Sequence, residues 1–280
     1  MIAPEGVGLR TLGCVSQPSG HEDRTYAFCT RFFAELQGLG VTDAVVSPGS
    51  RSTPLALAAH ACGLSITVQL DERVAGFHAL GQARAMGRPS VLICTSGTAG
   101  ANYFPAVVEA HHSGIPMVVC TADRPPELRQ WGAGQTIDQV HLYGARVRWF
   151  HELPVPSEVD ADHARSLALR AVTTAVTGAG PVHLNWPFRE PLAPAGPIQV
   201  PEPSLSPLEF SRRRPSASEL EALGHAHERG LIVVGPADLP VRVVEEISAF
   251  ATRHAWPIIA DPASGFRGGS GAQATVVTLS

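Results

Sequence analysis

The sequence lacks the features that mark membrane, secreted and nucleic-acid-binding proteins. No apolar run approaches the length of a membrane-spanning helix. The N-terminus does not show the charged and then apolar pattern of a secretory signal. The formal net charge of -4 provides no basic surface for a nucleic acid. We therefore expect a cytoplasmic protein that has no membrane span and does not bind nucleic acid.

Cysteine is scarce and its spacing is unpaired. The 280 residues include 5 cysteines without CxxC spacing, which fits reduced thiols better than a disulfide framework. There are 12 histidines, but no HExxH motif, and the adjacent His111 and His112 diverge on a helix. We expect no protein-only metal site. A P-loop and a GxGxxG motif are also absent.

What is present indicates an α/β protein. An apolar share of 44% and a charged share of 16% are typical of globular chains. Strand and helix patterns alternate four times with short connections, which predicts a doubly wound parallel sheet. Predicted strands are 43–47, 65–69, 90–94, 117–121 and 181–185, with an edge strand at 147–151. Predicted helices cover 25–38, 71–86 and 160–177. Two further helices are predicted, one with Thr53 as its N-terminal cap and one that ends near Ser113.

Composition divides the chain into four segments. Residues 1–20 form a predicted loose leader, and 21–190 the main α/β domain. Prolines recur without period in a predicted linker, 191–217, which also contains three consecutive arginines. The remainder, 218–280, starts with a helix over 218–227 and begins a second α/β domain. Because only two strands are predicted there (231–234 and 257–260), we expect this domain to be incomplete.

Glu72 lies at a strand-to-helix junction. The carboxyl ends of parallel strands are where ligands bind in open α/β sheets. Glu72, Gly76, Ala79 and Ala83 share one helical stripe, so a ligand or another helix can approach closely. We expect a partly buried carboxylate and contact between two copies of the chain through this stripe. The simpler interpretation is a solvated first-turn acid that stabilises the helix dipole.

Three loops should meet at the same edge of the sheet. The first, 48–52, carries Arg51, which can bind a carboxylate or phosphate through two parallel hydrogen bonds. The second, 95–102, is rich in small residues and opens a helix, which favours an anion or a polar ring edge. The third, 123–127, presents Arg124 beside prolines. Each loop alone is explained by ordinary turn chemistry, but two arginines and one acid together indicate a ligand site.

Four motifs, in order, resemble one enzyme family. The sequences PGSRSTPL (48–55), DER (71–73), TSGTA (95–99) and TADRPPEL (121–128) are similar to the N-terminal half of the SEPHCHC synthase family, thiamine-diphosphate enzymes of menaquinone biosynthesis. The resemblance runs from about Thr25 to Gly265. It implies that 21–190 is the domain that binds the aminopyrimidine ring of the cofactor.

The resemblance also implies a reaction and a set of site residues. The family decarboxylates 2-oxoglutarate and joins the resulting succinyl semialdehyde unit to isochorismate, a transferase or carboligase reaction. Glu72 would be catalytic, through a hydrogen bond to a ring nitrogen. The residues implied for the cofactor are Pro48, Gly49, Glu72, Thr98 and Asn102, and those implied for the substrates are Ser50, Arg51, Arg124 and Gln135.

The family resemblance further implies Mg²⁺ or Mn²⁺, with ligands in a C-terminal domain that these residues do not include. Related enzymes are homodimers or homotetramers, with each active site between two subunits, so we expect these 280 residues alone to be inactive. Two alternatives remain. One is another thiamine-diphosphate carboligase or decarboxylase, such as an acetolactate-synthase relative, although two arginines exceed the needs of monocarboxylates. The other is a non-catalytic α/β module.

Overall fold

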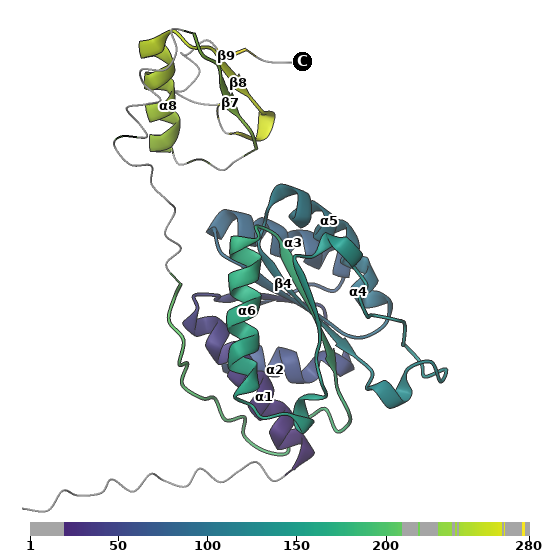
Figure 1. Cartoon of the computed structure of the whole chain (residues 1–280). Helices are drawn as coiled ribbons and strands as arrows, with labels where there is room; N and C mark the ends of the chain where they lie inside the picture. Colours follow the sequence, from purple (N-terminus) through teal and green to yellow (C-terminus); the bar gives the residue numbers. More distant parts are fainter. Residues whose placement is uncertain are drawn as a thin grey trace, which may run out of the picture. The chain divides into compact units, whose positions relative to one another are not determined.

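The computed structural model describes residues 20–208, 218, 229–236, 239, 241–264, 266 and 276–277. The chain divides into two compact units, Met1–Leu208 and Glu209–Ser280, which we describe separately (Figure 1). The boundary between them falls inside the predicted linker, 191–217. Nearly all of the predicted leader and of the helix over 218–227 lies outside the described residues.

A six-stranded parallel sheet forms the centre of the first unit. Its order is β2-β1-β3-β4-β6-β5, and every neighbouring pair is parallel. The predicted doubly wound α/β fold is confirmed, and β5 lies at an edge as expected. The strands are β1 (Asp43–Val46), β2 (Ser65–Val68), β3 (Ser90–Cys94), β4 (Met117–Asp123), β5 (Trp149–Glu152) and β6 (Pro181–Pro187).

Helices cover both faces of this sheet, which explains the continuous apolar strands. Along β3, Val91 and Ile93 pack into one hydrophobic cluster, whereas Leu92 and Cys94 pack into the other. Figure 1 shows the helices of the two faces. The first face carries α1 (His21–Gly38), α2 (Thr53–Ala61) and α6 (His163–Thr177), and the second carries α3 (Glu72–Met86), α4 (Thr98–Asn102) and α5 (Phe104–Ser113).

The start of α2 and the ends of two strands are among the details that differ from the sequence prediction. Thr53 is the first residue of α2, after the cap position of Ser52, and its hydroxyl donates to the Ser50 carbonyl at 2.7 Å. It therefore does not cap the helix. Strands β4 and β6 also extend two residues beyond their predicted ends, because their pairing continues through Asp123 and Pro187.

The second unit is a smaller parallel sheet in the order β7-β8-β9. The two predicted strands are present, but the expectation of only two strands is wrong, because Val276 and Val277 pair with Ile258 and Ile259. A small apolar cluster around the fully buried Phe266 packs this unit. Its elements are β7 (Ile232–Val234), α8 (Val241–His254), β8 (Ile258–Ala260) and β9 (Val276–Val277). No helix in the described parts of the chain is long and apolar enough to span a membrane.

Part of the proline-rich segment lies along α1 as a strap, residues 192–205. The Glu35 carboxylate, fully buried, accepts hydrogen bonds from the Ser204 amide at 3.0 Å and the Leu205 amide at 2.8 Å. A side chain cannot fit at Gly38, where an added Cβ would lie 2.4 Å from the Leu205 carbonyl oxygen. Tyr26 fixes the other end of the strap through a 2.8 Å bond to a backbone carbonyl.

We predict that Glu35→Gln loosens the strap. Although burial raises the pKa of Glu35, the bonds from Ser204 and Leu205 bring it below its usual value. The folded state therefore gains stability above the unfolded pKa and loses it as the pH falls. In glutamine the oxygen can still accept both backbone amides at the place of Oε2, but the NH₂ group takes the place of Oε1 and faces the Arg31 guanidinium, a donor, without accepting from it. The variant should therefore lose about 1–3 kcal/mol of unfolding free energy at pH 7. Urea unfolding measures the loss, with Glu22→Gln on the same helix as control. Equal stability of the two variants would contradict this role.

Candidate functional site

The sheet order reverses between β1 and β3, and ligands bind at such a reversal. The loops that follow these strands contact each other, because a Cβ added to Gly49 would lie 2.4 Å from the Thr95 Cβ. Tyr103 connects the ends of both strands, since its hydroxyl donates to the Ile93 carbonyl at 2.8 Å and to Ser47 Oγ at 3.3 Å. Only glycine allows this close approach of the two loops.

The third predicted loop joins them through Arg124. Its guanidinium donates to Ser96 Oγ at 2.6 Å and to the Gly134 carbonyl at 3.1 Å. Its backbone amide donates to Asp123 Oδ1 at 2.7 Å. The expected meeting of three loops at one edge is thus observed, and a fourth segment, around Gly134, takes part as well.

Arg51 is almost fully buried at this edge, with 6% of its surface exposed. It donates to the Phe188 carbonyl at 2.9 Å and to Glu190 at 3.1 Å, while its Nε has no partner. Burial and the nearby charge of Arg124 lower the pKa of Arg51. The Glu190 carboxylate is 72% exposed, so it offsets little of this charge. Two neighbouring guanidinium groups of which one is desolvated favour an anionic ligand.

The other two predicted substrate residues are more accessible. Ser50 is exposed beside Arg51, in a short 3-10 helix, Ser50–Ser52. Gln135 is exposed too, and its amide donates to the Ser96 carbonyl at 3.0 Å. Arg124 and Gln135 therefore meet at one residue, Ser96.

Glu72 is the first residue of α3 and is half-buried, as expected. The helix cap is its neighbour Asp71, which accepts from the Arg73 amide at 2.9 Å and also binds the Arg73 guanidinium. These bonds lower the pKa of Asp71 to about 2. The Glu72 charge lies close enough to Cys94, at the end of β3, to add to the rise that burial causes in the pKa of that thiol.

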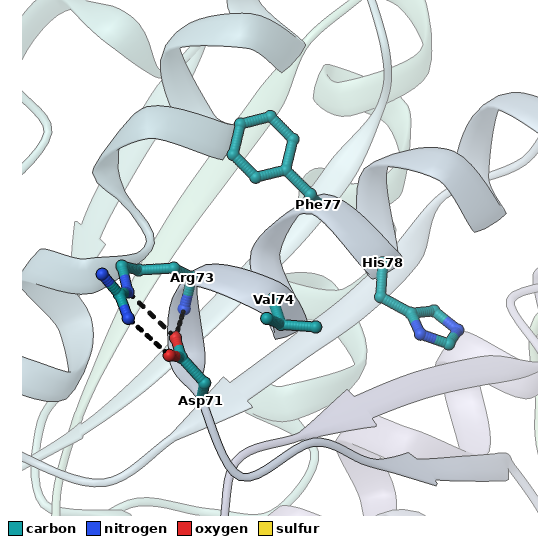
Figure 2. Close-up of a pocket in the computed structure, with 5 residues that line it drawn as sticks. All are labelled: Asp71, Arg73, Val74, Phe77 and His78. Carbon is teal, nitrogen blue, oxygen red and sulfur yellow. Dashed lines mark hydrogen bonds and ion pairs between the residues drawn. The ribbon is translucent and has the colours of Figure 1, made fainter.

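The small-residue stripe of α3 packs within the chain. Gly76, Ala79 and Ala83 are buried, and a Cβ added to Gly76 would lie 2.8 Å from Ala106 Cβ on α5. The prediction of chain-to-chain contact through this stripe is therefore wrong. The opposite side of α3 lines an open hollow, formed by Asp71, Arg73, Val74, Phe77 and His78 (Figure 2).

The predicted cofactor residues flank the reversal. Pro48 is exposed and Gly49 half-buried in the loop after β1. Thr98 is the exposed first residue of α4, and Asn102 is its half-buried last residue. The structure therefore places the cofactor set on the loops and helices that follow β1, β2 and β3.

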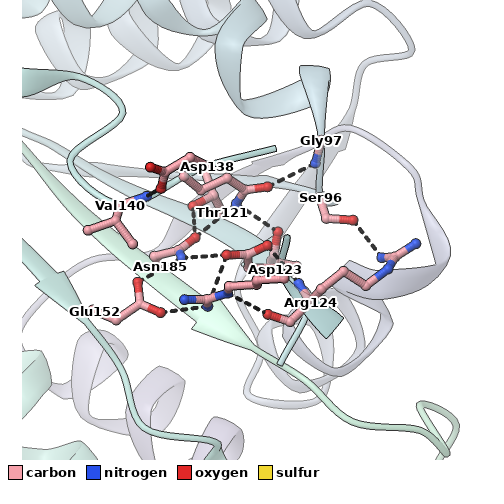
Figure 3. Close-up of polar contacts among 12 residues, drawn as sticks. Ser96, Gly97, Thr121, Asp123, Arg124, Asp138, Val140, Glu152 and Asn185 are labelled. Atoms are coloured by element: carbon pink, nitrogen blue, oxygen red, sulfur yellow. Dashed lines mark hydrogen bonds and ion pairs between the residues drawn. The ribbon is translucent and has the colours of Figure 1, made fainter. Parts of the chain in front are cut away.

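A buried polar cluster lies beneath the loops, and sequence reasoning missed most of it (Figure 3). At its centre, Asn185 is fully buried. Its Oδ1 accepts from Thr121 Oγ1 and from Gln139 Nε2, each at 2.8 Å. Its amide group donates to Asp123 and Glu152, each at 2.8 Å. Every hydrogen-bonding position of this amide is used.

Arg129 connects this cluster to the backbone of Arg124. It contacts the Asp123 carboxylate at 3.0 Å and Glu152 at 2.6 Å, and its Nε donates to the Arg124 carbonyl at 2.9 Å. Burial is the largest effect on the pKa of Asp123, which is raised. Since the fully buried Asp123 also accepts from the Arg124 amide, Arg124 is held on both sides of its peptide backbone.

A sequence signal for this cluster was available. Thr121 and Asp123 alternate in β4, and His183 and Asn185 alternate in β6, within strands that are otherwise apolar. Polar residues two apart on buried strands share one face and need partners. Gln139 had no such signal, because it comes from a loop.

The sequence of this chain is similar to those of known proteins. Residues 29–142 match the family model described as "Thiamine pyrophosphate enzyme, N-terminal TPP binding domain". The chain is 52% identical, over 84% of its length, to a protein of Geobacillus kaustophilus. It is 49% identical, also over 84%, to one of Chloroflexus aurantiacus. Both are named 2-succinyl-5-enolpyruvyl-6-hydroxy-3-cyclohexene-1-carboxylate synthase.

A relative of the same name from Listeria innocua is 45% identical over 89% of the chain. The chain spans less than half the length of these curated relatives: 43%, 41% and 45%, respectively.

We predict that His183 makes stability depend on pH. This side chain is fully buried, with Nε2 at 2.8 Å from Thr121 Oγ1, and burial lowers its pKa from 6.5 to about 3. Below pH 6.5 the unfolded state therefore binds a proton at His183 that the folded state does not bind. The free energy of unfolding falls as the pH decreases through this range. Between pH 7 and 5.5 this group should cost about 1 kcal/mol. Urea unfolding of His183→Gln at both pH values should show a smaller loss than the parent or the exposed control His60→Gln. An equal loss in all three proteins would refute the assignment.

Proposed function

From the N-terminal TPP-binding domain that residues 29–142 carry, we propose that this chain is part of a thiamine-diphosphate-dependent SEPHCHC synthase. Such an enzyme decarboxylates 2-oxoglutarate and adds the succinyl semialdehyde unit to isochorismate, in menaquinone biosynthesis. It is a transferase, or carboligase, and we place it in the cytoplasm. The proposal extends the names of the relatives to this chain.

One observation carries the proposal. A half-buried acid, Glu72, and two arginines lie on segments that meet where the sheet order reverses. Both proposed substrates are dicarboxylates, and fixed guanidinium groups suit them. Arg51, with a buried and unpartnered Nε, and Arg124 would bind the substrates together with Ser50 and Gln135.

The residues around the reversal fit the ring end of the cofactor. Gly49 lets the loop after β1 pack directly against Thr95, and Glu72 has no capping role to hold it, since Asp71 caps α3. When bound, thiamine diphosphate supplies the carbon nucleophile of the reaction. Glu72 would hold a proton at a ring nitrogen of the aminopyrimidine, while Pro48, Gly49, Thr98 and Asn102 would orient the ring.

The metal that accompanies the diphosphate has no identifiable site in the described residues. Among the described residues, no three His, Cys, Asp or Glu side chains form a group that could hold a metal ion. We propose that Mg²⁺ or Mn²⁺ is bound by residues beyond these 280, as hard cations need several oxygen ligands. We accordingly expect no turnover from these residues alone.

A second copy of the protein would complete the site. Next to Glu72, the outer side of α3 and the end of β2 expose a run of large apolar side chains: Val68 at 57%, Leu70 at 83%, Val74 at 52% and Phe77 at 48%. Exposed apolar surface of this kind favours a protein partner. We propose a homodimer or homotetramer in which this surface is covered.

We predict that Glu72→Gln in the assembled enzyme nearly abolishes activation of the cofactor and leaves the fold intact. Glutamine keeps the size of the side chain but cannot hold the proton at the ring nitrogen. Deuterium exchange at the thiazolium C2 position measures activation directly. Glu109→Gln, on the neighbouring α5, is the matched control. Parent-like exchange in Glu72→Gln would remove Glu72 from the mechanism.

We predict that Arg51→Lys is not a mild change. Lysine keeps the charge but loses the planar fork that reaches Phe188 and Glu190. The expected loss in kcat/KM is about 1.5–3 kcal/mol of transition-state binding. Arg88→Lys is the control, because Arg88 pairs with Asp43 at 3.1 Å, at the start of β1 and away from the loops. An unchanged kcat/KM together with lost stability would make Arg51 a structural residue.

A further inference from the structure

One buried peptide unit at the site is held on both sides by side-chain amides. The carbonyl of Ser96 accepts from Gln135 Nε2 at 3.0 Å. The amide of Gly97, in the same peptide unit, donates to Gln139 Oε1 at 2.8 Å. Both glutamines come from one loop, and they hydrogen-bond the loop that leads from β3 into α4.

This peptide needs external support because of its conformation. Gly97 has a φ of +85°, and an added Cβ would lie 3.0 Å from Gln135 Cγ. Glycine alone adopts this conformation easily, but it also leaves the chain free to move. A buried N–H without a partner would carry a full desolvation cost. The Gln139 oxygen therefore supplies the hydrogen-bond acceptor that the buried Gly97 amide needs.

The two glutamines differ in how they are anchored. Gln135 is exposed, whereas Gln139 is buried, with only 1% of its surface accessible to solvent. Gln139 Nε2 donates to the Ala122 carbonyl at 3.1 Å and to Asn185 Oδ1 at 2.8 Å. Gln139 thus connects the Gly97 peptide to the ends of β4 and β6, which are part of the rigid sheet.

We propose that Gln139 is a positioning residue that fixes the Ser96–Gly97 peptide, and with it the partner of Arg124, relative to the sheet. The inference rests on the proposed function only for its catalytic consequence. Ser96 Oγ is 2.6 Å from the Arg124 guanidinium, so a shift of this peptide moves the place where Arg124 is held. It also moves Thr98, which follows Gly97 directly. The side-chain amide of Gln139 is itself bonded to Gly97, Ala122 and Asn185.

Amide hydrogen exchange of this chain tests the positioning role without any cofactor. In Gln139→Met the Gly97 amide loses its acceptor, so segment 95–102 should exchange on the order of tenfold faster, with β3 and β4 unchanged. Gln139→Glu keeps an acceptor oxygen and should protect Gly97 better than Met does. Gln82→Met is the control, because Gln82 bridges Asp43 and Ser90 at the opposite ends of β1 and β3 in the same manner.

Two outcomes would overturn the proposal. One is unchanged exchange of 95–102 in Gln139→Met. The other is faster exchange throughout the sheet to the same degree, which would make Gln139 a contributor to global stability alone. In the assembled enzyme, kcat/KM should fall about tenfold in Gln139→Met, measured at a temperature at which variant and parent are both fully folded. If the parent enzyme shows no dependence on thiamine diphosphate, the proposed function fails while the exchange result still decides the role of Gln139.

Discussion

The edge of the sheet depends on one buried amide. Asn185 lies near the end of β6, and its four hydrogen bonds reach three elements: β4 through Thr121 and Asp123, β5 through Glu152, and the loop that carries Gln139. A buried amide is costly unless all its positions are paired. Because every position of the Asn185 amide is paired, this buried polar group does not weaken the core but holds several elements in register.

This arrangement separates packing from chemistry along each strand. Residues 91–94 of β3 and 117–120 of β4 pack into two apolar clusters, whose burial favours folding. The end of β4 at Asp123, and the loops that follow the strands, carry the charged groups. A parallel sheet brings all these ends to one side. The charges can therefore be close together, as Arg51 and Arg124 are, without disturbing the core below them.

The sequence was informative where a pattern is local. Apolar runs located β1 to β4 and β6, and the rule for parallel sheets placed the loops of Arg51 and Arg124 together. It failed where the answer lay in partners far along the chain. The small-residue stripe at Gly76 could pack against any helix, and in the structure it packs against α5 of the same chain. β9 is two residues long, too short for a periodic signal. Gln139 acquires its role only through contacts with Gly97 and Asn185.

The strap on α1 restricts how the sequence of this region can vary. Ten residues of α1 are buried, and the position of Gly38 has no room for a side chain because the Leu205 carbonyl occupies it. A substitution at Gly38 is tolerated only if the backbone near Leu205 retreats, and that would pull the Ser204 and Leu205 amides away from Glu35. In homologues, residues at these positions should therefore change together, although Glu35 and Ser204 are 169 residues apart along the chain.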